Sequence, residues 1–112
     1  MSKIQKVKKE LFPIIFKKGR SWRLDFFSLS ILPLPGQKSS FAFVASNKTA
    51  KKAVERNRIK RRMRAIIAKH LSEIKEGYAA VFALKSPLGQ ATFKNIEDNI
   101  CQLLRKAKIL KT

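Results

Sequence analysis

The sequence predicts one domain of the α+β class, built as a small α-β sandwich in which the helices cover one face of a sheet. Three observations support this prediction. The chain has 112 residues, which suits a single domain. Apolar residues make up 45% of it, close to the globular average. Segments with helix and strand periodicity follow one another in the order α-β-β-α-β-α, without a linker or an internal repeat, so the domain spans residues 1–112.

Three elements are predicted in the first half of the chain. The stretch "IQKVKKELFPIIFKKG" predicts a short helix whose regular part starts near Phe12, because Pro13 fits best in a first turn and Gly19 is a typical stop. The alternating stretch 24–32 predicts a strand, and "PLPGQKSS" over 33–40 has the composition of a turn. A second strand follows over 41–46, so we expect the two strands to pair as a hairpin.

A long helix, a buried strand and a last helix are predicted in the second half. The long helix extends over about 49–75, and Gly77 marks its end. The continuous apolar run "YAAVFALK" over 78–85 has the length of a buried strand. Thr92 can cap the last helix over 93–110, whose apolar residues recur at helical spacing and should face the sheet.

The net charge of +19 indicates a polyanionic partner, because such a field opposes the compact state. Nucleic acid is the first candidate, and an anionic membrane surface is the second. The apolar runs are too short to span a bilayer, and the N-terminus lacks the apolar stretch of a signal peptide. Cys101 is the single cysteine, so we expect a small buried hydrophobe and neither a disulfide nor a zinc cluster. These features together predict a cytoplasmic protein.

The predicted long helix has distinct faces when each residue is advanced by about 100° around its axis. One face is an apolar stripe that must pack on the sheet, formed by Ile59, Met63, Ile66, Ile67, His70 and Ile74. A second face, which we call the cationic stripe, is formed by Ala53, Asn57, Lys60, Arg61 and Arg64. Arg58 and Arg62 lie on the third side. A solvated face would carry glutamates one turn from its cations, but only Glu55 is available. We therefore favour a phosphate-binding face, which suits the planar guanidinium of arginine.

The chain offers few groups for catalysis. Its seven carboxylates are scattered along the sequence, whereas a two-metal nuclease needs several that converge on ions about 3.5–4 Å apart. His70 is the one histidine, and its place on the apolar stripe predicts a core or boundary residue. We expect no catalytic and no metal-binding residue on this chain.

Aromatic residues near the N-terminus have two interpretations. Phe12 and Phe16 share one face of the predicted first helix because they are four residues apart. They either belong to the core or form a stacking surface for unpaired bases, and the cations Lys17, Lys18 and Arg20 can neutralise phosphates beside them.

The strand that follows leaves a second question open. Phe26 and Phe27 point to opposite faces of it, so at most one of them joins the core directly. The sequence does not decide which one, or whether Trp22 lies in the core or at a rim.

Several stretches together match one known family. Arg56-Asn57-Arg58 lies on the long helix, preceded by Ala53 and followed by Lys60, Arg61 and Arg64. The first helix, "LFPIIFKKGRS", has two aromatic residues four apart and a closing glycine. "FAFVASNK" and "EGYAAVFALK" match in order and length. The sequence thus resembles the protein subunit of bacterial ribonuclease P over nearly the whole chain. Asn47 departs from the pattern, because the family often has a basic residue there.

The resemblance implies a fold and a function. The implied fold is an α-β sandwich of the ribosomal protein S5 domain 2 type, with a left-handed βαβ crossover in place of the usual right-handed one. The implied function is to bind a catalytic RNA and the 5′ leader of precursor tRNA while the leader is removed. The RNA is expected to carry the catalytic groups and to hold Mg²⁺, with no cofactor bound by the protein alone.

The resemblance also assigns residues and partners. Contacts to the catalytic RNA are expected from Lys48, Arg56, Asn57, Arg58, Lys60, Arg61 and Arg64. A cleft for the single-stranded leader is expected at Phe12, Phe16, Lys17 and Arg20. The expected partners are ribonuclease P RNA and precursor tRNA, without DNA or a membrane. Two alternatives remain: a small basic ribosomal protein, and a protein that binds membranes through a basic amphipathic helix.

Overall fold

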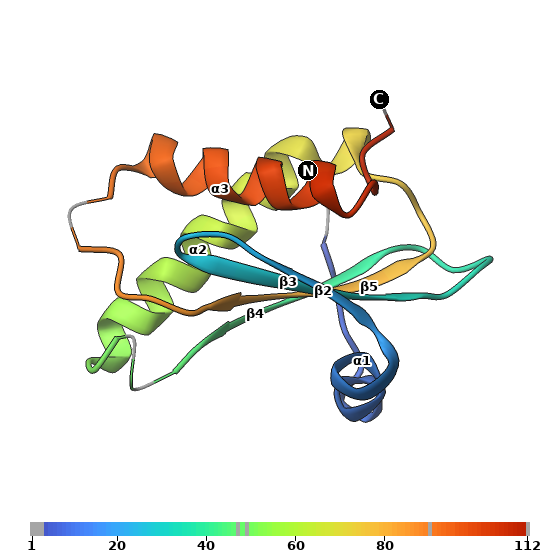
Figure 1. Ribbon diagram of the computed structural model, residues 1–112, viewed down its shortest axis with the longest axis horizontal. Helices are drawn as coiled ribbons and strands as arrows, with labels where there is room; N and C mark the ends of the chain where they lie inside the picture. The colour runs from blue at the N-terminus through green and yellow to red at the C-terminus, as the bar shows by residue number, and fades with distance from the viewer. Residues whose placement is uncertain (1–3, 47, 49, 90, 112) are drawn as a thin grey trace.

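The computed structural model describes residues 4–46, 48, 50–89 and 91–111 as an α+β sandwich (Figure 1). The strands are β1 (Gln5–Lys6), β2 (Arg20–Arg23), β3 (Phe27–Pro33), β4 (Ser40–Ala45) and β5 (Tyr78–Leu84). The helices are α1 (Phe12–Lys18), α2 (Ala53–His70) and α3 (Phe93–Lys106), and the short 3-10 turns η1 (Lys9–Leu11) and η2 (Leu71–Glu73) adjoin α1 and α2.

The five strands form one mixed sheet in the order β1-β4-β5-β3-β2. β5 pairs in parallel with β4 and antiparallel with β3, so β4, α2 and β5 form the predicted crossover unit. Its hand, which the resemblance implies to be left, stays a prediction. The predicted hairpin between 24–32 and 41–46 is wrong, because β5 is inserted between β3 and β4. The continuous apolar run of β5 needs burial on both faces, which only a central position provides.

The true hairpin joins β2 to β3. The chain turns at residues 24–26, where the Leu24 amide donates a 3.0 Å hydrogen bond to the Phe27 carbonyl. The predicted strand over 24–32 therefore begins too early, and β2 before it was not predicted at all. Phe27 is fully buried, whereas Phe26, which lies in the turn, and Trp22 are half-buried against the same core.

The helices lie on both faces of the sheet, which corrects the prediction that they cover one face (Figure 1). α2 and α3 cover the face that carries Ala80, Phe82 and Leu84, and this main core holds most of the buried side chains. α1 covers the opposite face. A smaller second core, formed by Val7, Ile15, Ala79 and Val81, lies beneath it. Alternate residues of β5 thus serve two cores, which explains why its sequence shows no polar alternation.

The apolar stripe of α2 is confirmed as the face that packs on the sheet. Met63, Ile66 and Ile67 are fully buried, and Ile59 and His70 are half-buried. The helix is shorter than predicted. It begins at Ala53, Thr49 lies outside the described residues, and after His70 the chain continues as η2. Ile74 is buried beyond the helix, in an antiparallel bridge with Leu110.

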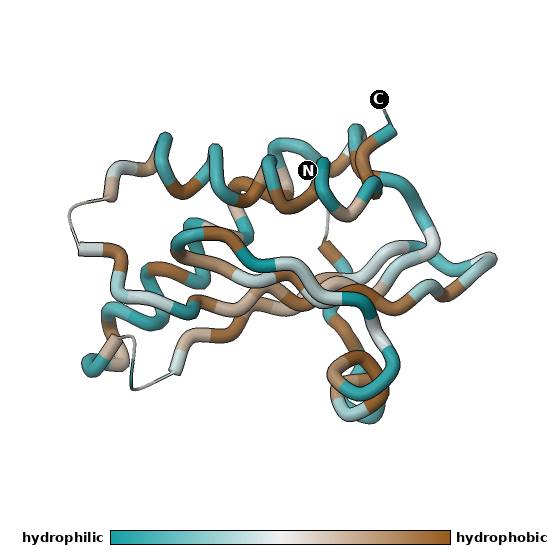
Figure 2. The backbone as a smooth tube through the Cα atoms, in the orientation of Figure 1, coloured by the Kyte–Doolittle hydropathy of each residue, from teal (hydrophilic) through white to brown (hydrophobic). Residues whose placement is uncertain are grey.

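α3 confirms the predicted cap and stripe with one exception. The Thr92 side chain accepts a hydrogen bond from the Asn95 amide, and the Asn95 side chain accepts one from the Thr92 amide. Ile96, Ile100, Leu103 and Leu104 are fully buried, and Figure 2 shows the apolar side of the helix turned to the sheet. Phe93, predicted on this stripe, is 45% exposed at the first helical position. The helix ends at Lys106, before the predicted residue 110.

Candidate RNA interface

The cationic stripe lies on the solvent side of α2. Asn57, Arg61 and Arg64 are exposed, and Lys60 is half-buried. A hollow of about 510 Å³ lies along the stripe, lined by Val54, Asn57, Lys60, Arg61 and Arg64. The floor of this hollow is partly apolar, because Val54 is 66% exposed. The stripe therefore offers guanidinium groups, an amide and a small apolar surface together, which suits a polyanion that also has flat apolar groups.

One arginine of the stripe is held by an aromatic ring. The Arg64 guanidinium carbon lies 5.9 Å from the centre of the Phe43 ring, and that ring stacks on Phe82 with a centroid distance of 6.1 Å. A cation over an aromatic face is attracted by the ring quadrupole. A ring of β4 thereby contacts a cation of α2 and joins the stripe to the main core.

The other predicted contacts on and before α2 lie in three different places. Lys48 and Arg58 are exposed, Lys48 in the segment before α2 and Arg58 on the third side of the helix. Arg58 lines a groove of about 370 Å³ together with Arg62 and the loop after β5. Arg56 is half-buried and turns inward: its Nη1 donates hydrogen bonds of 2.9 Å to the carbonyls of Ala50 and Lys51.

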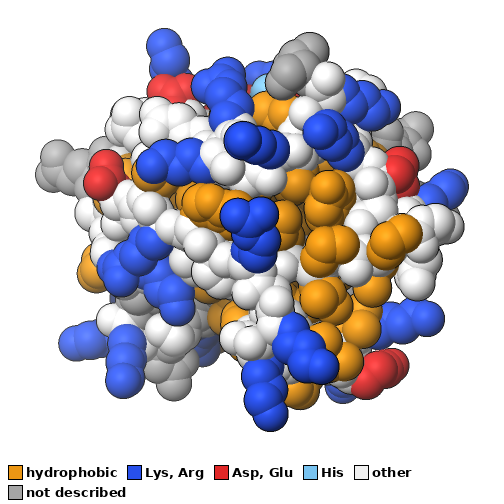
Figure 3. Space-filling view, turned by 45° about the vertical axis from the view of Figure 1, so that its right-hand side comes forward, with side chains coloured by type: hydrophobic (Ala, Val, Ile, Leu, Met, Phe, Trp, Pro, Cys, Tyr) orange, Lys and Arg blue, Asp and Glu red, His pale blue; other side chains and the backbone are white. Residues whose placement is uncertain are grey.

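The outer side of α1 carries the predicted aromatic pair. The rings of Phe12 and Phe16 have centroids 6.2 Å apart. Phe12 is half-buried against the second core, whereas Phe16 is 59% exposed and Lys17 is exposed beside it. Figure 3 shows one face of the molecule on which lysine and arginine side chains surround exposed apolar atoms. Such a mixture of cations and flat apolar groups is typical of surfaces that bind single-stranded nucleic acid.

On the α1 side of the sheet, the strands β2 and β3 carry small polar residues. The Ser21 and Ser30 hydroxyls are 2.9 Å apart across β2 and β3, and Ser28 and Ser30 are buried. The contact between these two hydroxyls links β2 to β3 on this face.

Arg20 is not placed with the Phe12–Phe16 pair. It lies opposite Ile31 in the β2–β3 register, on the main-core face of the sheet, and its guanidinium carbon lies 5.5 Å from the centre of the Trp22 ring. Arg23, which was not among the predicted site residues, lies opposite Ser28 and thus on the α1 face. The strand period of two would have identified Arg23 if residues 20–23 had been assigned to a strand.

Comparison with known proteins decides the family. The ribonuclease P family model matches residues 1–108. The chain belongs to the ribonuclease P protein family. The ribonuclease P protein component of Pseudanabaena sp. is 33% identical over 104 residues, covering 92% of this chain and 90% of that protein. The corresponding protein of Shouchella clausii is 32% identical over 111 residues, covering 98% and 91%.

Solved structures show the same fold. The RNase P protein of Staphylococcus aureus superposes with a TM-score of 0.85 at 24% sequence identity, covering 97% of this chain and 99% of that one. The chain is thus the protein subunit of ribonuclease P, a ribonucleoprotein endoribonuclease. The ribosomal-protein alternative is not favoured, because family and fold agree over nearly the whole length.

The far end of α2 carries a different cluster. The two ring nitrogens of His70 bridge two acids: Nδ1 lies 2.7 Å from Glu73 Oε2, and Nε2 lies 2.9 Å from Glu97 Oε2. Lys69 Nζ lies 3.0 Å from the same Glu97 oxygen, and Cys101 Sγ lies 3.6 Å from His70 Nε2. Hydrogen bonds to Glu73 and then Glu97 raise the pKa of His70 above its ordinary value of 6.5. His70 is therefore a boundary residue that ties α2 to α3.

The cysteine and the metal predictions concern this same cluster. Cys101 is half-buried beside His70, and burial raises the pKa of its thiol. Within the described part of the chain, no group of three or more His, Cys, Asp or Glu side chains is arranged to hold a metal ion. In the same part, no helix is long and apolar enough to cross a bilayer.

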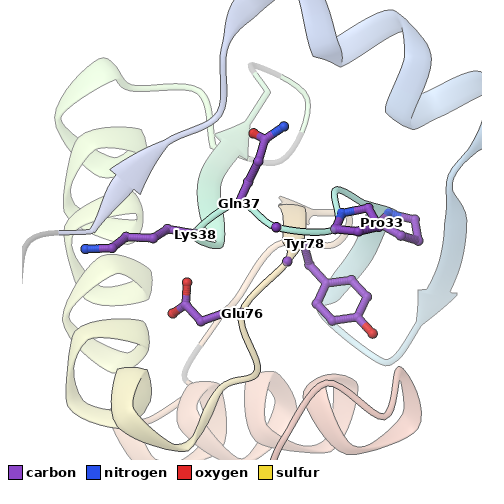
Figure 4. A pocket seen from close by; sticks show the side chains of 8 residues that line it. Pro33, Gln37, Lys38, Glu76 and Tyr78 are labelled. Atoms are coloured by element: carbon purple, nitrogen blue, oxygen red, sulfur yellow. The ribbon is translucent and has the colours of Figure 1, made fainter.

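A further hollow lies at the end of the sheet where β3 ends and β5 begins. It has a volume of about 500 Å³ and is lined by Pro33, Pro35, Gly36, Gln37, Lys38, Glu76, Gly77 and Tyr78 (Figure 4). The Lys38 and Tyr78 side chains point away from each other, and Glu76 Oε2 accepts a 3.0 Å hydrogen bond from the Ser39 amide. A carboxylate beside a single lysine makes this a poor site for phosphate.

Proposed function

We propose that the subunit binds the catalytic RNA of ribonuclease P through α2 and the segment before it. The proposed contacts are Lys48, Asn57, Arg58, Lys60, Arg61 and Arg64, with Arg56 among them or supporting them. The observation that carries this proposal is the cationic stripe itself. Its cations lie on the solvent side of α2, while the ion pairs found among the described residues involve Lys69 and His70 at the other end of the helix.

We propose a separate site for the 5′ leader of precursor tRNA beside α1. Phe16 offers an exposed ring on which unpaired bases can stack, Phe12 supports that ring, and Lys17 supplies charge. Arg23 fits this site better than Arg20, because its place in β2 is on the α1 face of the sheet. The two sites use different helices, so one chain can bind RNA subunit and substrate together.

The proposed division of labour leaves the chemistry to the RNA, together with Mg²⁺ that the RNA holds. Among the described residues no group of three or more His, Cys, Asp or Glu side chains is arranged to hold a metal ion, and the one histidine bridges two acids at the α2–α3 contact. We place this activity in the cytoplasm, where precursor tRNA is processed in bacteria. The membrane alternative receives no support, because the apolar face of α2 is committed to the main core.

The deciding experiment is reconstitution. The purified chain is added to ribonuclease P RNA at low Mg²⁺, and cleavage of precursor tRNA at the mature 5′ end is followed. The proposal requires the chain to bind this RNA and to accelerate cleavage. A chain that instead copurifies with ribosomal RNA, and leaves cleavage unchanged, contradicts the proposal.

A further inference from the structure

The segment that leads into α2 is electrostatically unfavourable. Lys48, Lys51 and Lys52 are all exposed within five residues, and they precede a helix N-terminus, which carries a partial positive charge of its own. Lys52 occupies the N-cap position, where no side-chain hydrogen bond is made. Residues that usually cap a helix, such as Ser, Thr, Asp or Asn, would satisfy a backbone amide there. Order in this segment must therefore come from elsewhere.

Hydrogen bonds from Arg56 hold the segment before α2 in place. Its Nη1 donates to the carbonyls of Ala50 and Lys51, each at 2.9 Å, while its backbone amide donates to the Lys52 carbonyl at 3.1 Å. Ala50 is 5% exposed, and its amide donates to the Ser46 carbonyl at 3.0 Å. One arginine thus links three successive carbonyls before and at the start of α2.

We infer that Arg56 is a positioning residue, which fixes residues 50–52 so that Lys51 and Lys52 are held beside the cationic stripe for RNA binding. This inference rests on the proposed function of α2. It differs from the expectation that Arg56, Asn57 and Arg58 all contact the catalytic RNA. Asn57 and Arg58 are exposed, whereas Arg56 is half-buried with its Nη1 turned to backbone carbonyls. It also adds Lys51 and Lys52 to the RNA-binding surface.

A matched pair of conservative substitutions on α2 separates positioning from the presence of charge alone. Arg56→Lys and Arg62→Lys both keep the charge, and Arg62 is not among the proposed RNA contacts. The lysine ammonium has three donors, but the lysine side chain is shorter than that of arginine, so at position 56 we expect it not to reach both carbonyls. We expect Arg56→Lys to weaken binding to ribonuclease P RNA about tenfold, the loss that follows from releasing hydrogen bonds to a charged donor. Arg62→Lys should stay within about threefold of wild type. Equal losses for the two variants would overturn the inference.

Hydrogen exchange of the free protein tests the same link without RNA. We expect the Ala50 amide, which donates to the Ser46 carbonyl, to exchange faster in Arg56→Lys than in wild type, and to be unchanged in Arg62→Lys. Unchanged exchange in Arg56→Lys would show that the guanidinium does not hold the segment, and the inference would fail.

A double-mutant cycle gives a readout that a merely structural role does not move. Arg56→Ala is combined with a Lys51→Ala and Lys52→Ala chain, and RNA binding is titrated at a temperature where every variant is folded. If Arg56 acts through the lysines, the combined loss is smaller than the product of the separate losses by about threefold or more. The same cycle with Arg58→Ala should give losses that multiply.

The outcomes of this cycle distinguish a failure of the inference about Arg56 from a failure of the proposed function. Losses that multiply for Arg56 as well would make it an independent contact and overturn this inference alone. Failure of the wild-type chain to bind ribonuclease P RNA would overturn the proposed function itself. Arg56→Lys covers the case in which Arg56→Ala does not fold.

Discussion

His70 holds acidic side chains from two other parts of the chain. Glu73 follows it in η2, and Glu97 comes from α3. A protonated imidazole donates from both nitrogens and satisfies both carboxylates, whereas a neutral ring donates from one only. The charge of a single ring therefore affects how firmly the end of α2 is tied to α3.

This arrangement predicts a pH-dependent stability. The folded pKa of His70 is raised above 6.5, so the folded state binds a proton more tightly than the unfolded state. The stabilisation is complete below 6.5 and is lost as the pH rises through the raised folded pKa. The midpoint of urea denaturation should fall as the pH rises across that window, and His70→Gln should abolish this fall. An equal fall of the midpoint in His70→Gln would contradict the prediction.

Phe16 gives a prediction about the substrate. If its exposed ring stacks on unpaired bases, Phe16→Ala should weaken binding of precursor tRNA by about 1–3 kcal/mol. Mature tRNA has no leader, so its affinity should be nearly unchanged, and so should assembly with the catalytic RNA. Titrations of holoenzyme with both tRNAs make the comparison. Equal losses for both tRNAs would exclude a leader contact, and a large fall in melting temperature would place Phe16 in the core instead.

At the scale of elements, Gly19 controls how α1 joins the sheet. Its amide donates a 2.8 Å hydrogen bond to the Ile15 carbonyl, and a β-carbon built on it would meet that carbonyl oxygen and would lie 2.5 Å from the Ile31 carbonyl oxygen. Backbone atoms cannot move aside as a flexible side chain can. Gly19→Ala should therefore destabilise the fold by about 1–3 kcal/mol, measured by urea denaturation. Gly36→Ala is no suitable control, because Gly36 has a φ of 82°.

The faces of α2 give a prediction that separates binding from folding. Arg61→Ala and Arg64→Ala should weaken assembly with the catalytic RNA while the domain stays folded, and Arg62→Ala should matter less. Ile66→Ala, in contrast, should cost about 2–5 kcal/mol of stability, because Ile66 is fully buried. Filter binding and thermal melts give the two readouts. Equal binding losses for the three arginine variants would refute the assignment of faces.

Sequence patterns predicted the elements better than their arrangement. The helical period placed Met63 and Ile67 in the core and Arg61 outside it, because one period determines both faces at once. The strand β2 was missed because "RSWR" is short, polar and at the edge of the sheet. The position of α1 on the second face of the sheet was not predicted. The continuous apolar run of β5 indicates that the strand is buried on both faces, but it does not indicate which element covers each face.

The candidate site shows the same limit. Periodicity identified the cationic stripe, but it describes only the direction in which a side chain leaves the helix. Arginine is long enough to fold back, as Arg56 does to reach the Ala50 and Lys51 carbonyls. Arg20 was assigned by its nearness in sequence to Phe16, whereas the strand register turned it to the other face.

At the scale of the whole molecule, charge is divided between the two ends of α2. The stripe around Asn57 is basic, and the acidic pair Glu73 and Glu97 gathers around His70, thirteen residues farther along. That separation corresponds to about 20 Å along a helix axis. RNA that binds the basic end is therefore only weakly repelled by the acidic end at physiological ionic strength, because the screening length is about 8 Å.

The net charge of +19 predicts a steep salt dependence. If six to ten phosphates are neutralised, affinity for the catalytic RNA should fall by about 10³–10⁵ between 50 and 200 mM salt. The slope of log affinity against log salt concentration is the quantity to measure. A nearly flat line would mean that the cationic surface does not act through phosphate neutralisation.

The central position of β5 has a consequence for how the chain is made. Translation delivers β3, β4 and α2 before β5, yet β3 and β4 meet only through β5. Until residue 84 has left the ribosome, the nascent chain has two strands without a shared partner, and the apolar stripe of α2 has no complete sheet to cover it. The basic half of α2 is meanwhile already synthesised beside ribosomal RNA, a polyanion in large excess. Synthesis of β5 thus allows the sheet to close, and α3, which follows it in the chain, then covers the main core beside α2.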